Sequence, residues 1–278
     1  MKNIKKVGIL GVGFMGGSLA LALKKKLPDA CVWGYARNDN SYRRLKKLGI
    51  LDKVARDLKT VVNDADIVVL ALPVREIVNY FRKIAPFLKK SSVVVDLGSS
   101  KEIIERQVRK YLPKDIDFVG CHPLCGSEKS GAGFSRHDLY KRALCVITSS
   151  PNKVATKKVK RFWEKLGSKV IFLSATEHDK IISSMSHLPH LVSFSFIESI
   201  PDHYLKFATR SFKDLTRIAE SPAKVWADIF ISNKNNILRD LKRLNKTLAR
   251  FQVLLSKSDS KEIIRLIERV NLKRKNIL

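Results

Sequence analysis

The chain has few cysteines, few acidic side chains and almost no long apolar stretch, and each shortage limits what it can be. Only four of its 278 residues are cysteine, and nothing extracellular argues for pairing them, so we expect reduced thiols. Hydrophobic residues still make up 45% of the chain, which is enough to build large cores. The composition therefore excludes both a disordered chain and a disulfide scaffold.

One uncharged run, Val7 to Leu23, follows three lysines and resembles a signal peptide. Five glycines interrupt it, each lowering helix propensity by about 1 kcal/mol, and the sequence continues at once into further strand and helix patterns. We therefore interpret the run as part of a folded domain. No other run approaches the length of a membrane span, so we expect a soluble, cytoplasmic protein without a membrane partner.

Basic side chains outnumber acidic ones by 54 to 26, which gives a net charge of +28. The excess is spread along the chain, because residues 1–174 carry 35 basic and 15 acidic side chains and residues 175–278 carry 19 and 11. No zinc finger, aromatic RNA-binding strand or basic zipper accompanies the lysines, so we predict no specific nucleic acid partner. A basic surface does favour anionic substrates and cofactors.

A zinc site is the alternative use of the cysteines. Cys121, His122 and Cys125 have the spacing of half such a site, but no second Cys/His pair of suitable spacing accompanies them, and Cys145 lies in a strand-like run. We therefore interpret them as small residues around a loop and expect no bound metal.

Residues 1–174 alternate strand-like and helix-like segments. Short β-branched runs such as Ile67–Leu70 fit strands that are buried on both faces of a parallel sheet. The expected strands are residues 5–10, 31–35, 67–72, 93–96, 118–119, 144–148 and 170–173, and the expected helices are residues 18–25, 42–48 and 76–88. This order predicts an α/β domain with a parallel sheet.

Residues 175–278 change to long helical stretches with few glycines, which predicts a second, all-helical domain. One apolar seam follows a helix at alternating steps of four and three, at Ile237, Leu241, Leu244, Leu248, Phe251 and Leu255, and residues 261–270 predict a further amphipathic helix. The seam packs either within the chain or against a second copy. A domain of this size buries little core alone, so we favour a homodimer.

Gly11-Val-Gly13-Phe14-Met15-Gly16 lies between an expected strand and an expected helix. In that context the first glycine makes a tight turn, the second lets the backbone approach a diphosphate, and the third lets the helix close on the strand. The N–H groups at the start of the helix then bind the phosphates. The spacing predicts a dinucleotide site.

Polar clusters follow two of the expected strands. Ser99 lies after residues 93–96, where it either caps the next helix or faces a nicotinamide. His122 lies in what we expect to be a loop of residues 120–131, and it is the best candidate for a general base because imidazole titrates near neutral pH.

Two further clusters lie in the helical half. Ser186 and His190 are four residues apart and share a helix face. Pro189 between them disturbs the local backbone hydrogen bonds. Arg217 either clamps a carboxylate through its planar fork or forms an ordinary ion pair with Asp214.

Seven segments in order give the chain a resemblance to the prephenate dehydrogenase family. They are GVGFMGGS at 11–18, LPV at 72–74, DLGSSK at 96–101, GCHPLCGSEKSG at 120–131, SHLPH at 186–190, FKDLTRIAES at 212–221 and WADIF at 226–230. The resemblance implies a Rossmann domain at 1–174 and a helical dimerisation domain at 175–278. It also implies the oxidative decarboxylation of prephenate to 4-hydroxyphenylpyruvate in tyrosine biosynthesis, with NAD(P)+ as cofactor.

The resemblance also implies roles for single residues. His122 matches the family's catalytic histidine, and Ser99 matches the serine that orients this histidine and the nicotinamide. The groups implied on the substrate side are Ser186, His190, Arg217, Lys213 and Glu128, and those on the cofactor side are Gly11, Gly13, Phe14, Met15, Gly16, Arg37, Leu72 and Pro73.

Two departures from the family pattern affect the binding sites. After the second expected strand, where relatives that use NAD commonly have an aspartate, this chain has Tyr35-Ala36-Arg37-Asn38, so Arg37 is placed to meet a 2′-phosphate. We expect NADP to be accepted, while Asp39 or a solvated Arg37 keeps NAD open. Residues 208–211 replace a stretch that is often rich in glycine, which affects the substrate pocket.

Three other functions stay open at this point. A different enzyme of the wider hydroxyacid or imine reductase type would share the glycine loop and the helical domain, but would not need SHLPH together with TRIA. Arogenate, which carries an amine in place of the keto group, is the nearest alternative substrate. From another class, a basic nucleotide-binding protein without catalysis would need the glycines but not His122. No regulatory domain fits into a chain already divided in two, so any feedback by tyrosine is expected at or near the active site.

Overall fold

The computed structural model describes residues 4–126, 129–148 and 150–277. Contacts divide the chain into two compact units, Met1–Asn233 and Lys234–Leu278, and each is described by itself. The domain boundary predicted between residues 174 and 175 stays a prediction.

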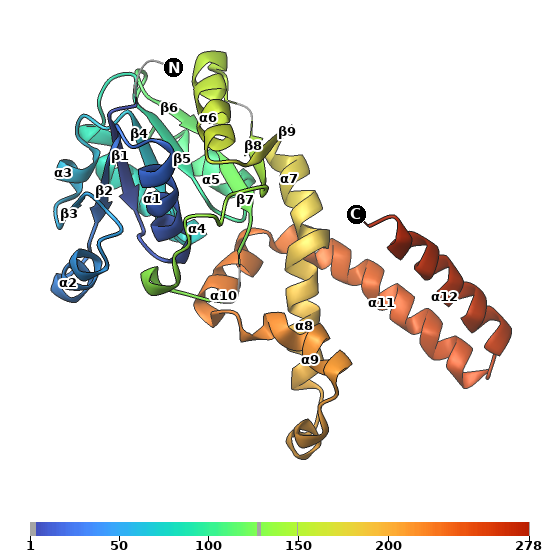
Figure 1. The fold of residues 1–278 in the computed structure, drawn as a ribbon. Helices are drawn as coiled ribbons and strands as arrows, with labels where there is room; N and C mark the ends of the chain where they lie inside the picture. The colour runs from blue at the N-terminus through green and yellow to red at the C-terminus, as the bar shows by residue number, and fades with distance from the viewer. Residues whose placement is uncertain (1–3, 127–128, 149, 278) are drawn as a thin grey trace. The chain divides into compact units, whose positions relative to one another are not determined.

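A six-stranded parallel sheet forms the centre of the first unit (Figure 1). Its strands are β1 (Lys6–Leu10), β2 (Cys31–Tyr35), β3 (Lys53–Ala55), β4 (Ile67–Leu70), β5 (Val93–Asp96) and β6 (Asp117–Val119), in the order β3-β2-β1-β4-β5-β6. The order reverses direction between β1 and β4, which is where doubly wound sheets bind dinucleotides. The predicted Rossmann-type sheet is confirmed.

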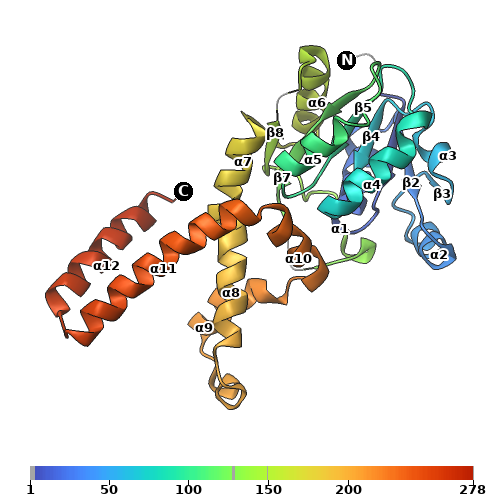
Figure 2. The same cartoon turned by 180° about the vertical axis from the view of Figure 1, so that it is seen from behind.

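Each face of the sheet is covered by helices, and the alternation of side chains along the strands builds one core on each face. Val7 and Ile9 join the core under α1 (Phe14–Lys26) and α6 (Lys153–Lys165). Leu10 and Val68 join the opposite core. That core lies under α3 (Leu58–Val62), α4 (Val74–Ile84) and α5 (Glu102–Val108), and α2 (Asp39–Leu48) follows β2. Figure 1 shows the face of the sheet that α1 and α6 cover, and Figure 2, which views the molecule from behind, shows the face that α4 and α5 cover.

Three strands form a second, smaller sheet in the order β7-β8-β9. They are β7 (Cys121–Leu124), β8 (Leu144–Thr148) and β9 (Lys169–Leu173). Our assignment of residues 120–131 to a loop was therefore wrong in its first part, because His122 pairs with Val146 in an antiparallel ladder. A proline within Cys-His-Pro-Leu hid this strand, since proline is uncommon inside sheets.

The remaining helices of the first unit follow the second sheet. They are α7 (Ala175–Ile182), α8 (Leu188–Glu198), α9 (Arg210–Thr216) and α10 (Ala223–Ser232). A π-helical turn, Ser183–His187, joins α7 to α8, and Pro189 lies in the first turn of α8. The backbone disturbance predicted at this proline is present, and such π turns often accompany functional sites.

The second unit is a pair of helices, α11 (Lys234–Ser256) and α12 (Ser260–Lys275), that fold back on each other (Figure 1). All regular elements after residue 174 are helical within the described residues, as predicted. Many apolar side chains of this unit are exposed, including Leu248 at 55% and Leu255 at 65% of their surface. Across the described part of the chain, no helix is both long and apolar enough to cross a membrane.

Candidate active site

The three glycines of the loop after β1 occupy three different environments. Gly11 has a φ of +91°, and a Cβ there would lie 2.2 Å from the carbonyl oxygen of Ala71. A Cβ on Gly16 would lie 2.3 Å from the carbonyl oxygen of Gly11, so only glycine lets α1 approach the strand. Nothing lies within 4 Å of a Cβ on Gly13. The loop therefore has one turn position, one contact position and one position open to a ligand.

The start of α1 is available for an anion. Its N-cap, Gly13, makes no side-chain capping bond, and its first turn contains no acidic residue. Tyr140 fixes this end of the helix from behind, because its hydroxyl donates to the carbonyl oxygen of Met15 at 2.7 Å. Phe14 is buried in the core. A diphosphate fits this arrangement, since free N–H groups and the positive end of the helix dipole favour negative charge.

Leu72 and Pro73 follow β4, the strand next to β1. A Cβ on Gly11 would lie 2.8 Å from Cδ2 of Leu72, so this side chain borders the glycine loop. Pro73 is exposed and forms the N-cap of α4. The structure thus brings both predicted cofactor residues to the point where the strand order reverses.

The end of β2 presents a cation and engages its acidic neighbour elsewhere. Arg37 is exposed. Asn38 caps α2, since its amide oxygen accepts from the Ser41 backbone at 2.9 Å. The Asp39 carboxylate is paired with Arg56. Asn38 has no carboxylate and that of Asp39 is bound to Arg56, so neither residue provides a free carboxylate next to Arg37.

His122 lies on β7, directly after the end of β6. The carboxylate of Asp96, at the end of β5, accepts from the backbone of Cys121 at 3.2 Å and fixes where β7 begins. His122 is therefore held at the carboxyl edge of the parallel sheet, the edge to which the glycine loop also belongs. The role of His122 as a general base stays a prediction.

A buried chain of hydrogen bonds leads away from His122. Its Nδ1 lies 2.8 Å from Nε2 of His178, and Nδ1 of His178 lies 2.7 Å from Oδ1 of Asp179. His178 is fully buried and Asp179 is 1% exposed. Burial is the main cause that lowers the pKa of His122 well below 6.5, and the nearby positive charge of Lys101 acts in the same direction. His122 is therefore neutral at neutral pH.

A buried ion pair between Lys101 and Asp96 lies beneath this chain, and both side chains are fully inaccessible. Nζ of Lys101 also donates to the carbonyl oxygen of Cys121 at 2.9 Å. The adjoining Ser99 is partly buried, and among the hydrogen bonds of the described residues none joins it to His122. Its orienting role stays a prediction.

A second group of polar side chains lies along α8 to α10. Nδ1 of His190 donates to the carbonyl oxygen of Ser186 at 2.9 Å, which leaves Nε2 as an acceptor. The His190 ring stacks on Trp226 with 3.5 Å between centroids. Burial lowers the pKa of His190, and the charge of Arg217 also lowers it. Arg217 begins a short 3-10 helix, Arg217–Glu220, that packs against α8.

The other predicted substrate residues are less tied to this group. Lys213 is exposed on α9, and Asp214 lies 3.8 Å from Arg210. Glu128 lies outside the described residues. The structure therefore places Ser186, His190 and Arg217 on elements that pack together, and the binding roles of all five residues stay predictions.

Sequence reasoning missed several members of the site. They are Lys101, Asp96, His178, Asp179, Asn233 and Trp226. Three of these had a usable signal, since Asp96 and Lys101 lie in DLGSSK and Trp226 lies in WADIF, two segments that resemble the family without indicating a role for these side chains. The His-Asp pair at 178–179 had none, because nothing local shows that it meets β7.

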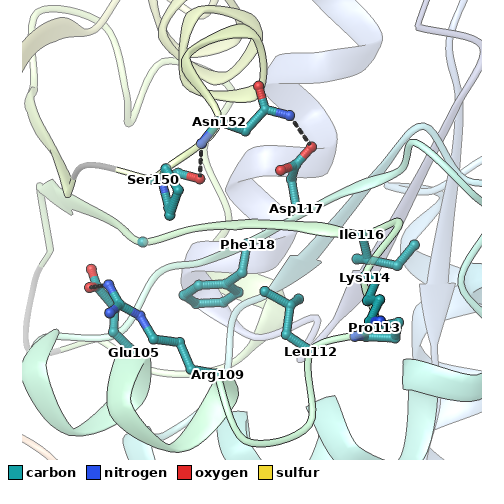
Figure 3. A pocket seen from close by; sticks show the side chains of 12 residues that line it. Glu105, Arg109, Leu112, Pro113, Lys114, Ile116, Asp117, Phe118, Ser150 and Asn152 are labelled. Carbon is teal, nitrogen blue, oxygen red and sulfur yellow. Dashed lines mark hydrogen bonds and ion pairs between the residues drawn. The ribbon is translucent and has the colours of Figure 1, made fainter.

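A cavity of about 350 Å³ lies elsewhere, between α5 and β6 (Figure 3). Its lining includes Glu105, Arg109, Leu112, Phe118 and Asn152. The amide of Asn152 donates to Asp117 at 2.9 Å on one side of it. No residue predicted to bind cofactor or substrate is among its lining residues, so we assign it no part in the site.

Two family models match the chain. The model described as "Prephenate dehydrogenase, nucleotide-binding domain" covers residues 19–172, and the one described as "Prephenate dehydrogenase, dimerization domain" covers residues 174–269.

Curated relatives match along most of the chain. A cyclohexadienyl dehydrogenase of Zymomonas mobilis is 30% identical over 267 residues, which is 90% of each chain. A prephenate dehydrogenase of Lactococcus lactis is 31% identical over 94% of this chain and 74% of its own length.

A solved structure is also similar throughout. The crystal structure of prephenate dehydrogenase from A. aeolicus in complex with hydroxyphenyl propionate and NAD+ has a TM-score of 0.91 and 33% sequence identity, and covers 99% of this chain and 98% of its own. The family models, relatives at 30% identity or more and this structural match show that the chain belongs to the prephenate dehydrogenase family of oxidoreductases.

Proposed function

We propose that the chain oxidises and decarboxylates prephenate to 4-hydroxyphenylpyruvate, with His122 as general base. The observation that carries this proposal is a neutral, partly buried imidazole at the same sheet edge as the glycine loop. Gly11 to Gly16 would hold the diphosphate of NAD(P)+, which supplies a hydride acceptor when bound. Nε2 of His122 takes the proton of the ring hydroxyl as hydride leaves the carbon, and loss of carbon dioxide then makes the ring aromatic.

Reduction of the nicotinamide on addition of prephenate tests this function. Arogenate is assayed in parallel, because some relatives are named prephenate dehydrogenase and others arogenate dehydrogenase. We expect a higher kcat/KM for prephenate. Absence of turnover with both substrates would reject the proposal.

We propose that Arg217 binds a carboxylate of the substrate and that His190 lies beside it on the substrate side. An arginine fork holds a carboxylate through two bonds, whereas Nε2 of neutral His190 can only accept and so does not itself bind a carboxylate. Arg217→Ala is expected to raise KM for prephenate about tenfold or more with kcat changed only a few-fold. A loss confined to kcat would instead assign Arg217 to the chemical step.

We propose that the cofactor site accepts NADP through Arg37. Asp39 is already paired with Arg56, so the end of β2 carries an exposed cation without a neighbouring carboxylate to bind ribose hydroxyls. Arg37→Ser is expected to lower kcat/KM for NADP about tenfold or more and to leave that for NAD nearly unchanged. Equal losses for both cofactors, or a strong NAD preference in the parent chain, would contradict this role.

We propose a homodimer built through α11 and α12. The matching model of this region is described as a dimerization domain, and the exposed apolar side chains there include Leu248, Leu255, Ile264, Val270 and Leu272. Light scattering of the parent chain is expected to give twice the chain mass. The double variant Leu248→Lys, Leu255→Lys is expected to be a monomer. Asn245→Lys, on the polar side of α11, is the control and is expected to remain a dimer. A monomeric parent chain would reject the dimer.

The four free thiols fit a reducing compartment, so we also propose a cytoplasmic location.

A further inference from the structure

His178 is a buried titratable group that the proposed reaction does not use. Its two ring nitrogens connect His122 on one side with Asp179 on the other, at 2.8 Å and 2.7 Å. The rings of His122 and His178 meet edge to face, with 5.1 Å between centroids. An unbroken line of polar atoms therefore runs from the proposed base into the protein interior.

The partners of Asp179 fix the direction of these bonds. Its Oδ1 accepts from the backbone of Lys101 at 2.7 Å, and its Oδ2 accepts from the backbone of Glu102 at 3.1 Å. Both oxygens of Asp179 therefore face N–H donors, and the oxygens of a carboxylate can only accept. Nδ1 of His178 must therefore donate to Asp179, and in neutral His178 the other nitrogen, Nε2, is an acceptor.

The same reasoning continues to the base. Because Nε2 of His178 accepts, Nδ1 of His122 must carry the proton and donate to it. Neutral His122 then has an unprotonated Nε2, the atom that the proposed reaction requires. The tautomer of the base is thus set by a residue 56 positions further along the chain.

We propose that His178, held by Asp179, is a positioning residue that fixes His122 in the tautomer with a basic Nε2 and stabilises its protonated form. This inference rests on the proposed function. When the substrate O–H bond breaks, an N–H bond forms at Nε2 of His122, and the positive charge of the ring is shared with an acceptor tied to a carboxylate. No further reactant is needed, since the hydride leaves to NAD(P)+.

The other charges near His122 do not replace this arrangement. Lys101 is paired with Asp96. His187 is fully buried, and burial lowers its pKa to about 4, so it is neutral when the base works. Nδ1 of His187 lies 3.1 Å from the amide nitrogen of Asn233, which donates to it. Asp179 is therefore the carboxylate whose charge reaches His122 through a hydrogen-bonded ring.

Nitrogen-15 NMR of the protein, with the His122 signal assigned from the His122→Gln spectrum, tests the tautomer without any turnover. We expect a protonated Nδ1 and an unprotonated Nε2 on His122 above pH 7. A proton on Nε2 would overturn the inference. If prephenate is not a substrate, the proposed function fails while the spectrum still decides the tautomer.

Two substitutions then separate positioning from packing. His178→Leu removes the acceptor, and we expect kcat to fall on the order of 10²- to 10³-fold with KM for prephenate within about threefold. The acid limb of kcat/KM should move down by about one pH unit, because the protonated base loses its acceptor. His178→Gln offers an amide oxygen to Nδ1 of His122, so it should recover part of kcat and keep the limb near its original place.

His187→Gln is the matched control, since it replaces a buried histidine that has no bond to His122. It should leave the acid limb unchanged. Equal losses in the Leu and Gln variants, with KM rising and thermal stability falling in parallel, would make His178 a packing residue and overturn the inference. A His178→Leu enzyme with the parent kcat and acid limb would also overturn it.

Discussion

The glycine loop and the histidine site share one edge of the sheet but are built in opposite ways. The loop is six consecutive residues whose function depends on missing side chains, as the close approach of Gly16 to Gly11 shows. The histidine site is made of buried polar side chains brought together from β5, β7, α5 and α7. The first depends on local chain geometry, and the second depends on the whole unit being folded. Changes in the two places should therefore differ in size and in kind.

The largest effect is expected when the base itself is removed. His122→Ala should lower kcat by about 10³-fold or more, with KM for prephenate and for the cofactor changed only a few-fold, because the ring acts on a proton in the transition state. Steady-state kinetics measure this split. His137→Gln, at an exposed histidine, serves as the control. A variant whose loss lies mainly in KM would place His122 among the binding groups instead.

The ion pair beneath the histidines should show how strongly this site depends on buried charge. Lys101→Met leaves the Asp96 carboxylate buried without its cation, and we expect unfolding in denaturant to become about 3–5 kcal/mol easier. Lys160→Met is the control, because its pair with Glu164 is on the surface and is worth at most about 1 kcal/mol. Adding Asp96→Asn should recover part of the loss. Equal effects of the two lysine changes would contradict the picture of a charge-dependent site.

Acid should weaken the histidine site and leave the glycine loop, which has no titrating group, unaffected. Burial lowers the pKa of His187 in the folded chain to about 4, against about 6.5 for a free imidazole, so protons bind the unfolded chain more tightly. The contribution of neutral His187 to the free energy of unfolding is complete above pH 6.5 and is lost as the pH falls. At pH 4 this residue alone lowers the free energy of unfolding by about 3 kcal/mol. The lowered pKa values of His122 and His178 act in the same direction.

Denaturant unfolding at a series of pH values measures this slope. His187→Gln should make it shallower between pH 6.5 and 4, while His137→Gln on the surface should not change it. An unchanged slope in the His187 variant would mean that the ring is already charged in the folded protein, which its burial opposes.

The same contrast explains what the sequence could predict. The alternation of β-branched runs and helices gave the sheet because each strand is buried on both faces, as Ile67 to Leu70 are. The glycine loop was predictable because its three roles depend on spacing within six residues. Long apolar periodicity likewise indicated the helices after residue 174.

The histidine site was only half predictable. His122 stood out by its residue type, but the sequence placed it in a loop because Pro123 disfavours a strand. The structure nevertheless has a strand there, β7, which pairs with β8. His178 and Asp179 could not be found, since their meeting with β7 and α5 depends on how α7 packs. A contact between residues 56 positions apart leaves no periodic trace in one sequence.

The smallest expected effect comes from the open glycine and gives the sharpest comparison. Gly13 has a φ of −95°, which alanine adopts easily, and nothing lies within 4 Å of a Cβ there. Gly13→Ala should therefore keep the thermal midpoint of the parent protein. Its methyl group enters the space left for the diphosphate, and we expect the Kd for the reduced cofactor to rise about tenfold, which is about 1.4 kcal/mol.

Gly16→Ala is the matched variant with the reverse outcome. A Cβ at Gly16 would lie 2.3 Å from the carbonyl oxygen of Gly11, so α1 must move and the protein should lose about 1–3 kcal/mol of stability even without cofactor. Fluorescence titration and thermal unfolding of both variants measure the two effects separately. If Gly13→Ala destabilised the protein and left cofactor binding intact, the open position would be a structural requirement of the turn, and the loop would lose its assignment as a ligand cradle.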